Sequence, residues 1–206
     1  MSEFQLYCFA ESGNAYKAAL MLELCGVDWE ARFVDFFNGE TRSDAYRSQV
    51  NEMGEVPVLV HGDRRLTQTG VMLEYFADQL GKFGWNNDDE RYEILRWMYF
   101  DNHKFTSYNA TLRFMLTFLK TGETPVTEFL RGRAVAAMQI VDTHLATRDF
   151  MVADRLTIAD LSLAGYMFYD GELGVELADF PNIVNWRERI SSQPGWKGPY
   201  DLMPKE

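Results

Sequence analysis

The strongest constraint on the fold is a change of hydrophobic period at the start of the chain. Apolar residues alternate from Phe4 through Leu6 to Cys8, which is the two-residue period of a strand. The spacing then becomes helical, and the apolar face comprises Ala15, Ala18, Ala19, Leu22 and Cys25. Gly26 follows as a C-terminal stop, and residues 29–36 form a second predicted strand. A helix between two strands indicates that the strands run parallel.

The remainder of the first 80 residues continues this mixed pattern. A short helix is predicted over residues 43–50, and residues 56–60 form a β-branched run. Pro57 cannot donate to a sheet ladder, so it belongs at the first residue of that strand. Gly62 and Asp63 form a tight turn into the next strand, and helical spacing returns from Thr67. Residues 1–80 are therefore predicted to have the order β-α-β-α-β-β-α.

The second half of the chain is predicted to be entirely helical. Residues 81–89 are polar and turn-rich, which indicates a linker before a helical domain over residues 90–206. One long helix carries a buried stripe made of Ile94, Met98, Asp101, Phe105, Tyr108, Leu112, Met115 and Leu119. Asp101 is its one charged member and needs a partner, which we expect at a domain or subunit interface. A capping box over residues 157–160 starts another helix, and Pro181 starts the last.

Charge and cysteine content exclude several classes of function. The chain has 20 Lys and Arg against 31 Asp and Glu, a formal net charge of −11. It lacks the cationic surface that nucleic acids and anionic membranes require. Cys8 and Cys25 are at no spacing that indicates a disulfide framework or a metal site. Neither a signal-peptide pattern nor an apolar run of membrane-spanning length is present, so we expect a soluble protein of the cytoplasm.

Four segments together resemble one protein family. They are Val56-Pro57-Val58-Leu59, Leu66-Thr67-Gln68-Thr69, Leu156-Thr157-Ile158-Ala159-Asp160 and Pro181-Asn182-Ile183-Val184-Asn185-Trp186. In this order and spacing they resemble the cytosolic glutathione S-transferases over nearly the whole chain. The resemblance implies an α/β plus all-α architecture, with a thioredoxin-like N-terminal domain that binds glutathione and a helical C-terminal domain. It also implies a homodimer, with glutathione as cosubstrate and no metal.

A fifth segment refines the resemblance and suggests how sulfur is activated. Residues 12–17 resemble the Ser-Gly-Asn-x-Tyr-Lys segment of a bacterial, serine-type group within the family. Glutathione reacts as its thiolate, but a free thiol with a pKa of about 8.5 is mostly protonated at neutral pH. A hydroxyl donor and a helix N-terminus both favour the thiolate, and Ser12 has that position.

Each residue near this sulfur position has an alternative role. Ser12 can be a plain helix N-cap. Asn14 can donate its side-chain amide to the sulfur or cap the helix itself. Tyr7 is the rival hydroxyl, although a strand tyrosine is usually a packing residue. Cys8 and Cys25 are interpreted as inert core thiols.

The resemblance also assigns the rest of the glutathione site. A cis Val56–Pro57 bond presents the Val56 backbone to an extended peptide. Gln68 and Thr69 hold the γ-glutamyl carboxylate at a helix N-terminus, or simply cap that helix. Arg42 is a candidate for the glycyl carboxylate, and its alternative is a solvated loop side chain.

Two glutamates depart from the family pattern. Glu52 stands where the related Asn-Pro-x-Gly segment has proline, and Glu55 stands where relatives often carry glutamine or lysine. A carboxylate beside an anionic ligand weakens binding by repulsion.

Candidates for the second-substrate pocket lie on the long helix. They are Tyr99, His103 and Ser107, beside the buried stripe. The family places this helix at that pocket, whereas a lone histidine is more often structural or solvent-facing.

The sequence therefore predicts a glutathione transferase that conjugates the thiolate to a hydrophobic electrophile. Two alternatives remain open. One is other glutathione-dependent chemistry at the same site, namely peroxidase, isomerase or disulfide reductase activity. The other is a binding or scaffold protein without turnover, as in elongation-factor gamma subunits. The presence of Ser12, Val56-Pro57 and Gln68-Thr69 favours an enzyme.

Overall fold

The computed structural model describes residues 2–205, which divide into two compact units. One unit runs up to Lys82 and also includes the C-terminal segment from Pro194. The other comprises residues Phe83–Gln193.

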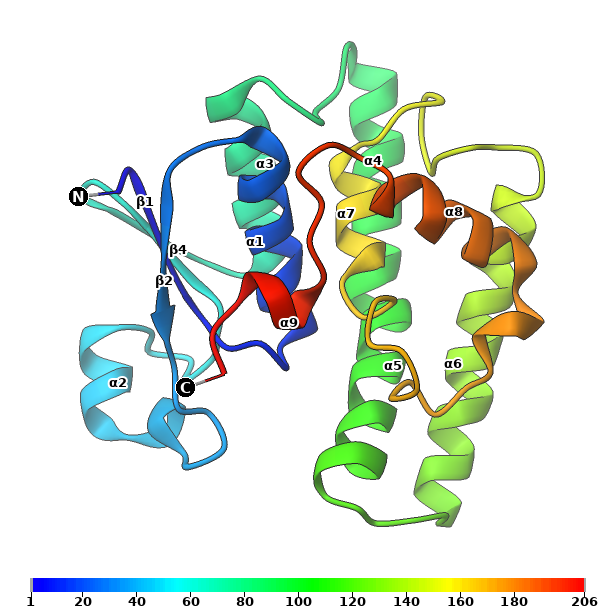
Figure 1. Ribbon diagram of the computed structural model, residues 1–206, viewed down its shortest axis with the longest axis horizontal. Coiled ribbons are helices and arrows are strands. Elements are labelled where there is room, and N and C mark those ends of the chain that lie inside the picture. Colours follow the sequence, from blue (N-terminus) through cyan, green and yellow to red (C-terminus); the bar gives the residue numbers. More distant parts are fainter. Residues whose placement is uncertain (1, 206) are drawn as a thin grey trace. The chain divides into compact units, whose positions relative to one another are not determined.

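The first unit is built on a four-stranded sheet with helices packed against it (Figure 1). Its elements are β1 (Phe4–Cys8), α1 (Gly13–Cys25), β2 (Trp29–Phe33), the 3₁₀ helix η1 (Glu40–Arg42), α2 (Asp44–Gln49), β3 (Val58–His61), β4 (Arg64–Thr67), α3 (Thr69–Leu80) and α9 (Pro199–Leu202). The strand order is β2-β1-β3-β4. β1 is parallel to β2 and antiparallel to β3, which in turn pairs antiparallel with β4. The predicted β-α-β-α-β-β-α order is confirmed.

The core of this unit follows the period read from the sequence. Phe4, Leu6 and Cys8 are all buried on one face of β1. The apolar face of α1 is buried as well, and α1 packs beside α3 (Figure 1). Gly26 ends α1 with φ 67°, a left-handed conformation that glycine adopts without steric cost.

The C-terminal segment is the main departure from the expected organisation. It was expected to complete the helical region over residues 90–206, but it packs on the first unit. The Tyr16 hydroxyl donates to the Lys197 carbonyl at 2.7 Å, and the Lys197 ammonium pairs with Glu23 at 2.6 Å. The Ala10 amide donates to the Pro204 carbonyl at 2.8 Å. These bonds hold the C-terminal segment beside α1. They join residues far apart in the sequence, so the local sequence pattern does not predict them.

Among the described residues, the regular secondary structure of the second unit consists of helices, which turns and loops connect. Its elements are α4 (Asp88–Phe100), the π-helical η2 (Asp101–Phe105), α5 (Thr106–Arg113), the π-helical η3 (Phe114–Phe118), α6 (Pro125–Leu145), α7 (Ile158–Ala164), the 3₁₀ helix η4 (Leu177–Asp179) and α8 (Pro181–Ser191). The first four form one uninterrupted helical stretch, as predicted. The buried stripe is less complete than predicted, because Tyr108 and Met115 are only partly buried and Leu119, where the helix ends, is exposed.

Three buried aspartates organise this helical unit: Asp101, Asp142 and Asp160. Asp142 accepts from the Asn182 amide at 2.8 Å and from the Ile183 amide at 3.1 Å, at the start of α8. Asp101 accepts hydrogen bonds from Thr106 at 2.7 Å and from Ser162 at 2.6 Å. These two partners lie inside the unit, so the expectation of a domain or subunit interface was wrong. Asp160 completes the predicted capping box with Thr157 at the start of α7.

Candidate functional site

Ser12 begins α1 at the turn that follows β1. Its amide donates to the Phe9 carbonyl at 3.1 Å, and its Oγ accepts from the Ala15 amide at 3.1 Å. The capping role therefore exists, and it uses the oxygen as an acceptor. No residue among 2–205 accepts the hydroxyl hydrogen of Ser12. The same group can thus cap α1 and donate to a ligand at the positive end of the helix dipole.

The structure shows where the other two sulfur-activating candidates, Asn14 and Tyr7, lie. Asn14 lies at the second position of α1, but Ser12 and not Asn14 is the cap, so that alternative for Asn14 was wrong. The side-chain amide of Asn14 makes no hydrogen bond within the described chain. Tyr7 is half-buried on the face of β1 opposite Cys8. Which of Ser12, Asn14 and Tyr7 activates the sulfur stays a prediction.

Both cysteines lie in environments that suppress reactivity. Burial raises the pKa of Cys8 to about 12 and that of Cys25 to about 11. A thiol with such a pKa is protonated at neutral pH and is a poor nucleophile. The interpretation as inert core residues is consistent with this.

Within residues 2–205 no group of three His, Cys, Asp or Glu side chains is placed to hold a metal ion.

The Val56–Pro57 peptide bond is cis, as the resemblance implies. Over the described residues, neither the amide nor the carbonyl of Val56 makes a hydrogen bond. The preceding residue is held firmly, because the Glu55 carbonyl accepts from the Tyr46 hydroxyl at 3.0 Å and from Asn51 Nδ2 at 2.9 Å. Val56 therefore offers a backbone donor and acceptor to which an extended peptide can pair.

Tyr46 and Asn51 are positioning residues that the sequence reasoning missed. Asn51 is buried, and its Oδ1 also accepts from the Met53 amide at 3.1 Å. Gly54 follows with φ 66°, and a Cβ there would lie 2.8 Å from the Thr41 carbonyl oxygen. The asparagine three residues before a glycine is the sequence signal for this loop. The loop is thus shaped by Asn51 and Gly54 even with Glu52 in the proline position.

Gln68 and Thr69 lie at the N-terminus of α3. Gln68 has φ 66° and ψ 113°, a strained backbone for any residue except glycine. Its Nε2 donates to Glu55 Oε2 at 2.9 Å, so Glu55 lies directly beside the Gln68 amide. The Thr69 hydroxyl donates to the Asn14 carbonyl at 3.2 Å, which joins the N-termini of α1 and α3. The amides of Thr69 and Gly70 make no hydrogen bond in the described chain and are available to an anion.

The remaining predicted site residues are all exposed. Arg42 is exposed at the end of η1, and none of residues 2–205 forms an ion pair with it. Tyr99, His103 and Ser107 are exposed on the helical unit, and 71% of the Tyr99 surface is open. The Ser107 hydroxyl donates to the Asn102 carbonyl at 2.6 Å. The structure brings Ser12, Asn14 and Thr69 together and joins Gln68 to Glu55, while Arg42 and the three helical residues stay predictions.

Because Gln68 has a positive φ, its effect on the free energy of unfolding and its effect on glutathione affinity can be measured separately. Gln68→Gly is expected to raise the free energy of unfolding by about 1 kcal/mol, because glycine adopts a positive φ without cost. The same change removes the side-chain amide and should weaken glutathione binding. Denaturant unfolding and calorimetric titration measure the two effects. Gln68→Ala is the matched control, since it removes the amide but keeps the strain; equal stability of the two variants would show that the backbone is relaxed.

Comparison with known proteins identifies the family. Residues 2–78 match the model of the glutathione S-transferase N-terminal domain, and residues 104–194 match that of the C-terminal domain. A crystal structure of a possible glutathione S-transferase from Rhodopseudomonas palustris is 32% identical, with a TM-score of 0.90, over 97% of this chain and 90% of that chain. The chain belongs to the glutathione S-transferase family. The first unit therefore has the thioredoxin-like fold of that family, and the second has its helical fold.

Other family members differ in activity. Glutathione S-transferase F14 of Arabidopsis thaliana is 28% identical over 95% of this chain and 82% of its own length. Maleylacetoacetate isomerase of Rhizobium meliloti is 29% identical over 89% of each chain. A glutathione transferase homologue from Drosophila mojavensis, solved with bound glutathione, shares the fold with a TM-score of 0.84 and 23% identity, over 94% of this chain and 90% of that chain.

No helix within residues 2–205 is long and apolar enough to cross a membrane.

Proposed function

We propose that this protein is a glutathione S-transferase of the serine type, which conjugates glutathione to a hydrophobic electrophile. The observation that carries the proposal is the Ser12 hydroxyl. It caps α1 through its oxygen, and its hydrogen has no acceptor within residues 2–205. Membership of the family supports glutathione as the cosubstrate.

The backbone of Val56 would pair with the cysteinyl part of glutathione, and the free amides at the start of α3 would take the γ-glutamyl carboxylate. Ser12 would then donate to the sulfur, and the α1 dipole would add to the stabilisation of its negative charge. The thiol proton leaves to solvent. The thiolate attacks an electrophilic carbon, so that a carbon–sulfur bond forms while the bond to the leaving group breaks and that group departs with its electron pair.

Glu55 also affects the affinity for glutathione in this arrangement. Its carboxylate accepts from Gln68 and so lies beside the expected γ-glutamyl end of the ligand. Glu55 would repel the carboxylate of that end, and Arg42 would offset part of the charge by meeting the glycyl carboxylate. We expect affinity for glutathione to be moderate for this reason.

Isomerase activity is the second candidate, because an isomerase is among the relatives at 29% identity. A thiolate that adds to an unsaturated substrate and then leaves again returns free glutathione with a changed substrate. Disulfide reductase activity is disfavoured, since the raised pKa of Cys8, about 12, leaves no reactive thiol in that position.

The test measures thiolate formation and product together. Ultraviolet difference spectra of glutathione bound to the protein, taken across pH, give the pKa of the bound thiol, and mass spectrometry identifies the product. A transferase gives a bound thiol pKa below that of a free thiol, about 8.5, and a glutathione conjugate. An unchanged substrate mass with a shifted structure would favour the isomerase, and a bound thiol that titrates as in free solution would overturn both.

A homodimer in the cytoplasm is part of the same proposal. Large apolar side chains are exposed on two helices of the second unit, which is consistent with a subunit interface; they are Tyr92 and Tyr99 on α4 and Val126, Phe129 and Ile140 on α6. Sedimentation equilibrium should return twice the chain mass, and a stable monomer would contradict this.

A further inference from the structure

A cavity of about 460 Å³ lies in the second unit, beside the loop that joins α6 to α7 (Figure 1). Its lining comprises Glu93 and Arg96 of α4, His144 near the end of α6, Arg148, and the loop residues 151–154. All of these residues belong to the second unit. The volume falls in the range of about 300–1,000 Å³ that is usual for small-molecule sites. The cavity therefore has room for a small organic ligand.

Arg148 is a cation of this lining that has no carboxylate partner. Its Nη1 donates to the His144 carbonyl at 3.2 Å, and it forms no ion pair within residues 2–205. Arg96, by contrast, is paired, because its Nε and Nη2 both donate to Glu93 Oε2, at 3.0 and 2.6 Å. Glu93 is thereby neutralised, and the charge of Arg148 remains for a ligand.

The His144 ring presents one nitrogen without a partner. Its Nε2 donates to the Met151 carbonyl at 2.9 Å, and the ring packs against Trp97 with centroids 4.5 Å apart. With hydrogen on Nε2, the Nδ1 atom of the neutral ring carries a lone pair. Nδ1 makes no hydrogen bond in the described part of the chain. It is therefore an acceptor that a ligand can use.

The charges around His144 are positive on balance. Burial is the main cause that lowers the pKa of His144, and Arg148 and Arg96 lower it further, against a hydrogen bond to the backbone and Glu93, which raise it. The ring is thus largely neutral at pH 7. Asp154 is the other carboxylate of the lining; it is exposed and would repel an anion to some degree.

The loop contributes backbone donors to the same cavity. Over residues 2–205, the amides of Val152, Ala153 and Asp154 donate no hydrogen bond. All three residues line the cavity. Unpaired amides at a concave surface are donors for an anion.

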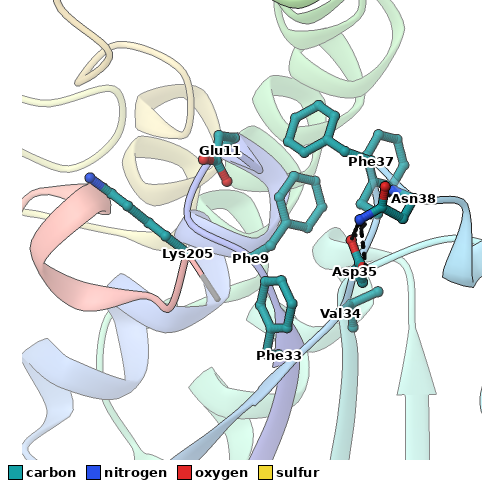
Figure 2. A pocket seen from close by; sticks show the side chains of 9 residues that line it. Phe9, Glu11, Phe33, Val34, Asp35, Phe37, Asn38 and Lys205 are labelled. Carbon is teal, nitrogen blue, oxygen red and sulfur yellow. Dashed lines mark hydrogen bonds between the residues drawn. The ribbon is translucent and has the colours of Figure 1, made fainter.

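The cavity of the first unit has a different lining. It has a volume of about 410 Å³ at the ends of β1 and β2, and it is lined by four phenylalanines and by the carboxylates of Glu11 and Asp35 (Figure 2). The Lys205 ammonium lies 4.5 Å from the centroid of the Tyr200 ring, and Figure 2 shows it extending away from the phenylalanines. Donors for an anion are therefore a particular feature of the second unit's cavity.

The donors and the lone pair fit a phosphate group better than a carboxylate. A phosphate monoester has three terminal oxygens, which can meet Arg148 and the loop amides from different directions. Its second pKa is about 6, so near neutral pH it can bring a proton to His144 Nδ1. An ionised carboxylate has no proton to share and would face the lone pair. The apolar side chains of Met151 and Val152 would contact the organic part of the ester.

We propose that this cavity binds the phosphate group of a small phosphate monoester, with one proton shared between the phosphate and His144 Nδ1. Arg148 would pair with the negative charge, and the amides of residues 152–154 would donate to the remaining oxygens. None of these residues belongs to the candidate glutathione site, so the proposal does not depend on conjugation. The Met151 amide donates to Asp160 at 2.8 Å, so a ligand beside Met151 would also stabilise the start of α7.

Calorimetric titration at pH 7 with phenyl phosphate, inorganic phosphate and benzoate tests the class of ligand. Phenyl phosphate should bind the wild-type protein at one site, about tenfold more tightly than either of the others. Equal affinity for benzoate would overturn the assignment of a phosphate group, and equal affinity for inorganic phosphate would overturn that of a monoester. Absence of phenyl phosphate binding at millimolar concentration would overturn the whole inference.

Three variants test the residues. Arg148→Gln should weaken phenyl phosphate binding about tenfold, the usual worth of one charge-assisted hydrogen bond. Arg64→Gln is the matched control, because Arg64 is exposed on β4 of the first unit, where its guanidinium lies over the Tyr75 ring. Asp154→Asn removes a lining carboxylate at φ 47°, which asparagine tolerates, and should tighten binding about twofold. Equal losses in Arg148→Gln and Arg64→Gln, or weaker binding in Asp154→Asn, would contradict the proposed site.

The position of the ligand can be read in the wild-type protein, without relying on a variant that folds. The chain has three histidines, at positions 61, 103 and 144, so few imidazole nitrogen signals need to be resolved by NMR. Phenyl phosphate should move the His144 Nδ1 signal toward that of a protonated nitrogen and leave the signals of the other two rings in place. Saturable binding with an unchanged His144 signal would place the ligand elsewhere and refute the proposal.

Discussion

Replacing Ser12 with alanine is expected to lower kcat/KM for conjugation at neutral pH by roughly 10²-fold, the usual cost of removing one hydrogen bond to a developing or resident anion. The hydroxyl favours the thiolate, so its loss raises the pKa of bound glutathione. The defect should therefore shrink as pH rises and more thiol ionises without help. A pH–rate profile of kcat/KM measures both the size and the shift.

Loss of the α1 cap must be separated from loss of the sulfur donor, because Ser12→Ala removes both. Asn87 caps α4 in the same way, since its Oδ1 accepts from the Glu90 amide at 2.9 Å. Asn87→Ala should cost a similar ~1 kcal/mol of stability and leave the pH–rate profile unchanged. Ser12→Thr should restore most of the rate. A Ser12→Ala profile that coincides with wild type would refute the catalytic role of Ser12.

Replacing Asp160 with asparagine should produce the largest stability loss in the chain, on the order of 3 kcal/mol. The carboxylate is fully buried and accepts four hydrogen bonds: from the Met151 amide at 2.8 Å, the Thr157 amide at 2.9 Å, the Thr157 hydroxyl at 3.0 Å and Trp186 Nε1 at 2.9 Å. An asparagine has one acceptor oxygen, and its amide nitrogen would face donors that cannot pair with it. Chemical denaturation of the purified variant measures the loss.

The pH dependence of the same variant gives an independent check. Burial is the main cause that raises the pKa of Asp160 to about 6, from an ordinary 3.8. The folded state therefore holds this proton more tightly than the unfolded chain does. The stability that the proton contributes is complete below pH ~4 and is lost as pH rises through ~6. The gap between wild type and Asp160→Asn should narrow over this window.

An exposed carboxylate provides the comparison for Asp160. Asp170 forms a surface ion pair with Arg187 at 2.6 Å, and Asp170→Asn should change the free energy of unfolding by at most about 0.5 kcal/mol. A loss as small as this in Asp160→Asn would mean that the buried network does not hold α7 and α8 together.

The parts of the fold that the sequence predicted depend on local patterns. The period change after Cys8, the stop at Gly26 and the capping box at Asp160 each act within a few residues, so the element order could be derived. The cis bond before Pro57 came from the family resemblance. Contacts between distant residues could not be derived in this way. The bond from Tyr16 to Lys197 joins residues 181 apart, and it places the C-terminal segment with the first unit.

In the candidate site, too, local features could be predicted from the sequence and contacts between distant residues could not. Ser12 was placed correctly at the start of α1 because N-cap preference is local. The hydrogen bond between Gln68 and Glu55 spans 13 residues, so no local pattern could place the Glu55 carboxylate beside the Gln68 side chain. The stacking of Phe9 on Phe36 likewise joins two different loops, so no local pattern predicts it.

Calorimetric titration of the protein with reduced glutathione at neutral pH tests the central claim most directly, since the proposed conjugation requires that complex. Saturable one-site binding, weakened in Gln68→Ala and unaffected in Leu119→Ala, a change at an exposed apolar side chain outside the candidate site, is the result we expect. Absence of binding at millimolar glutathione would contradict the account and would indicate a protein that keeps the transferase fold without the activity.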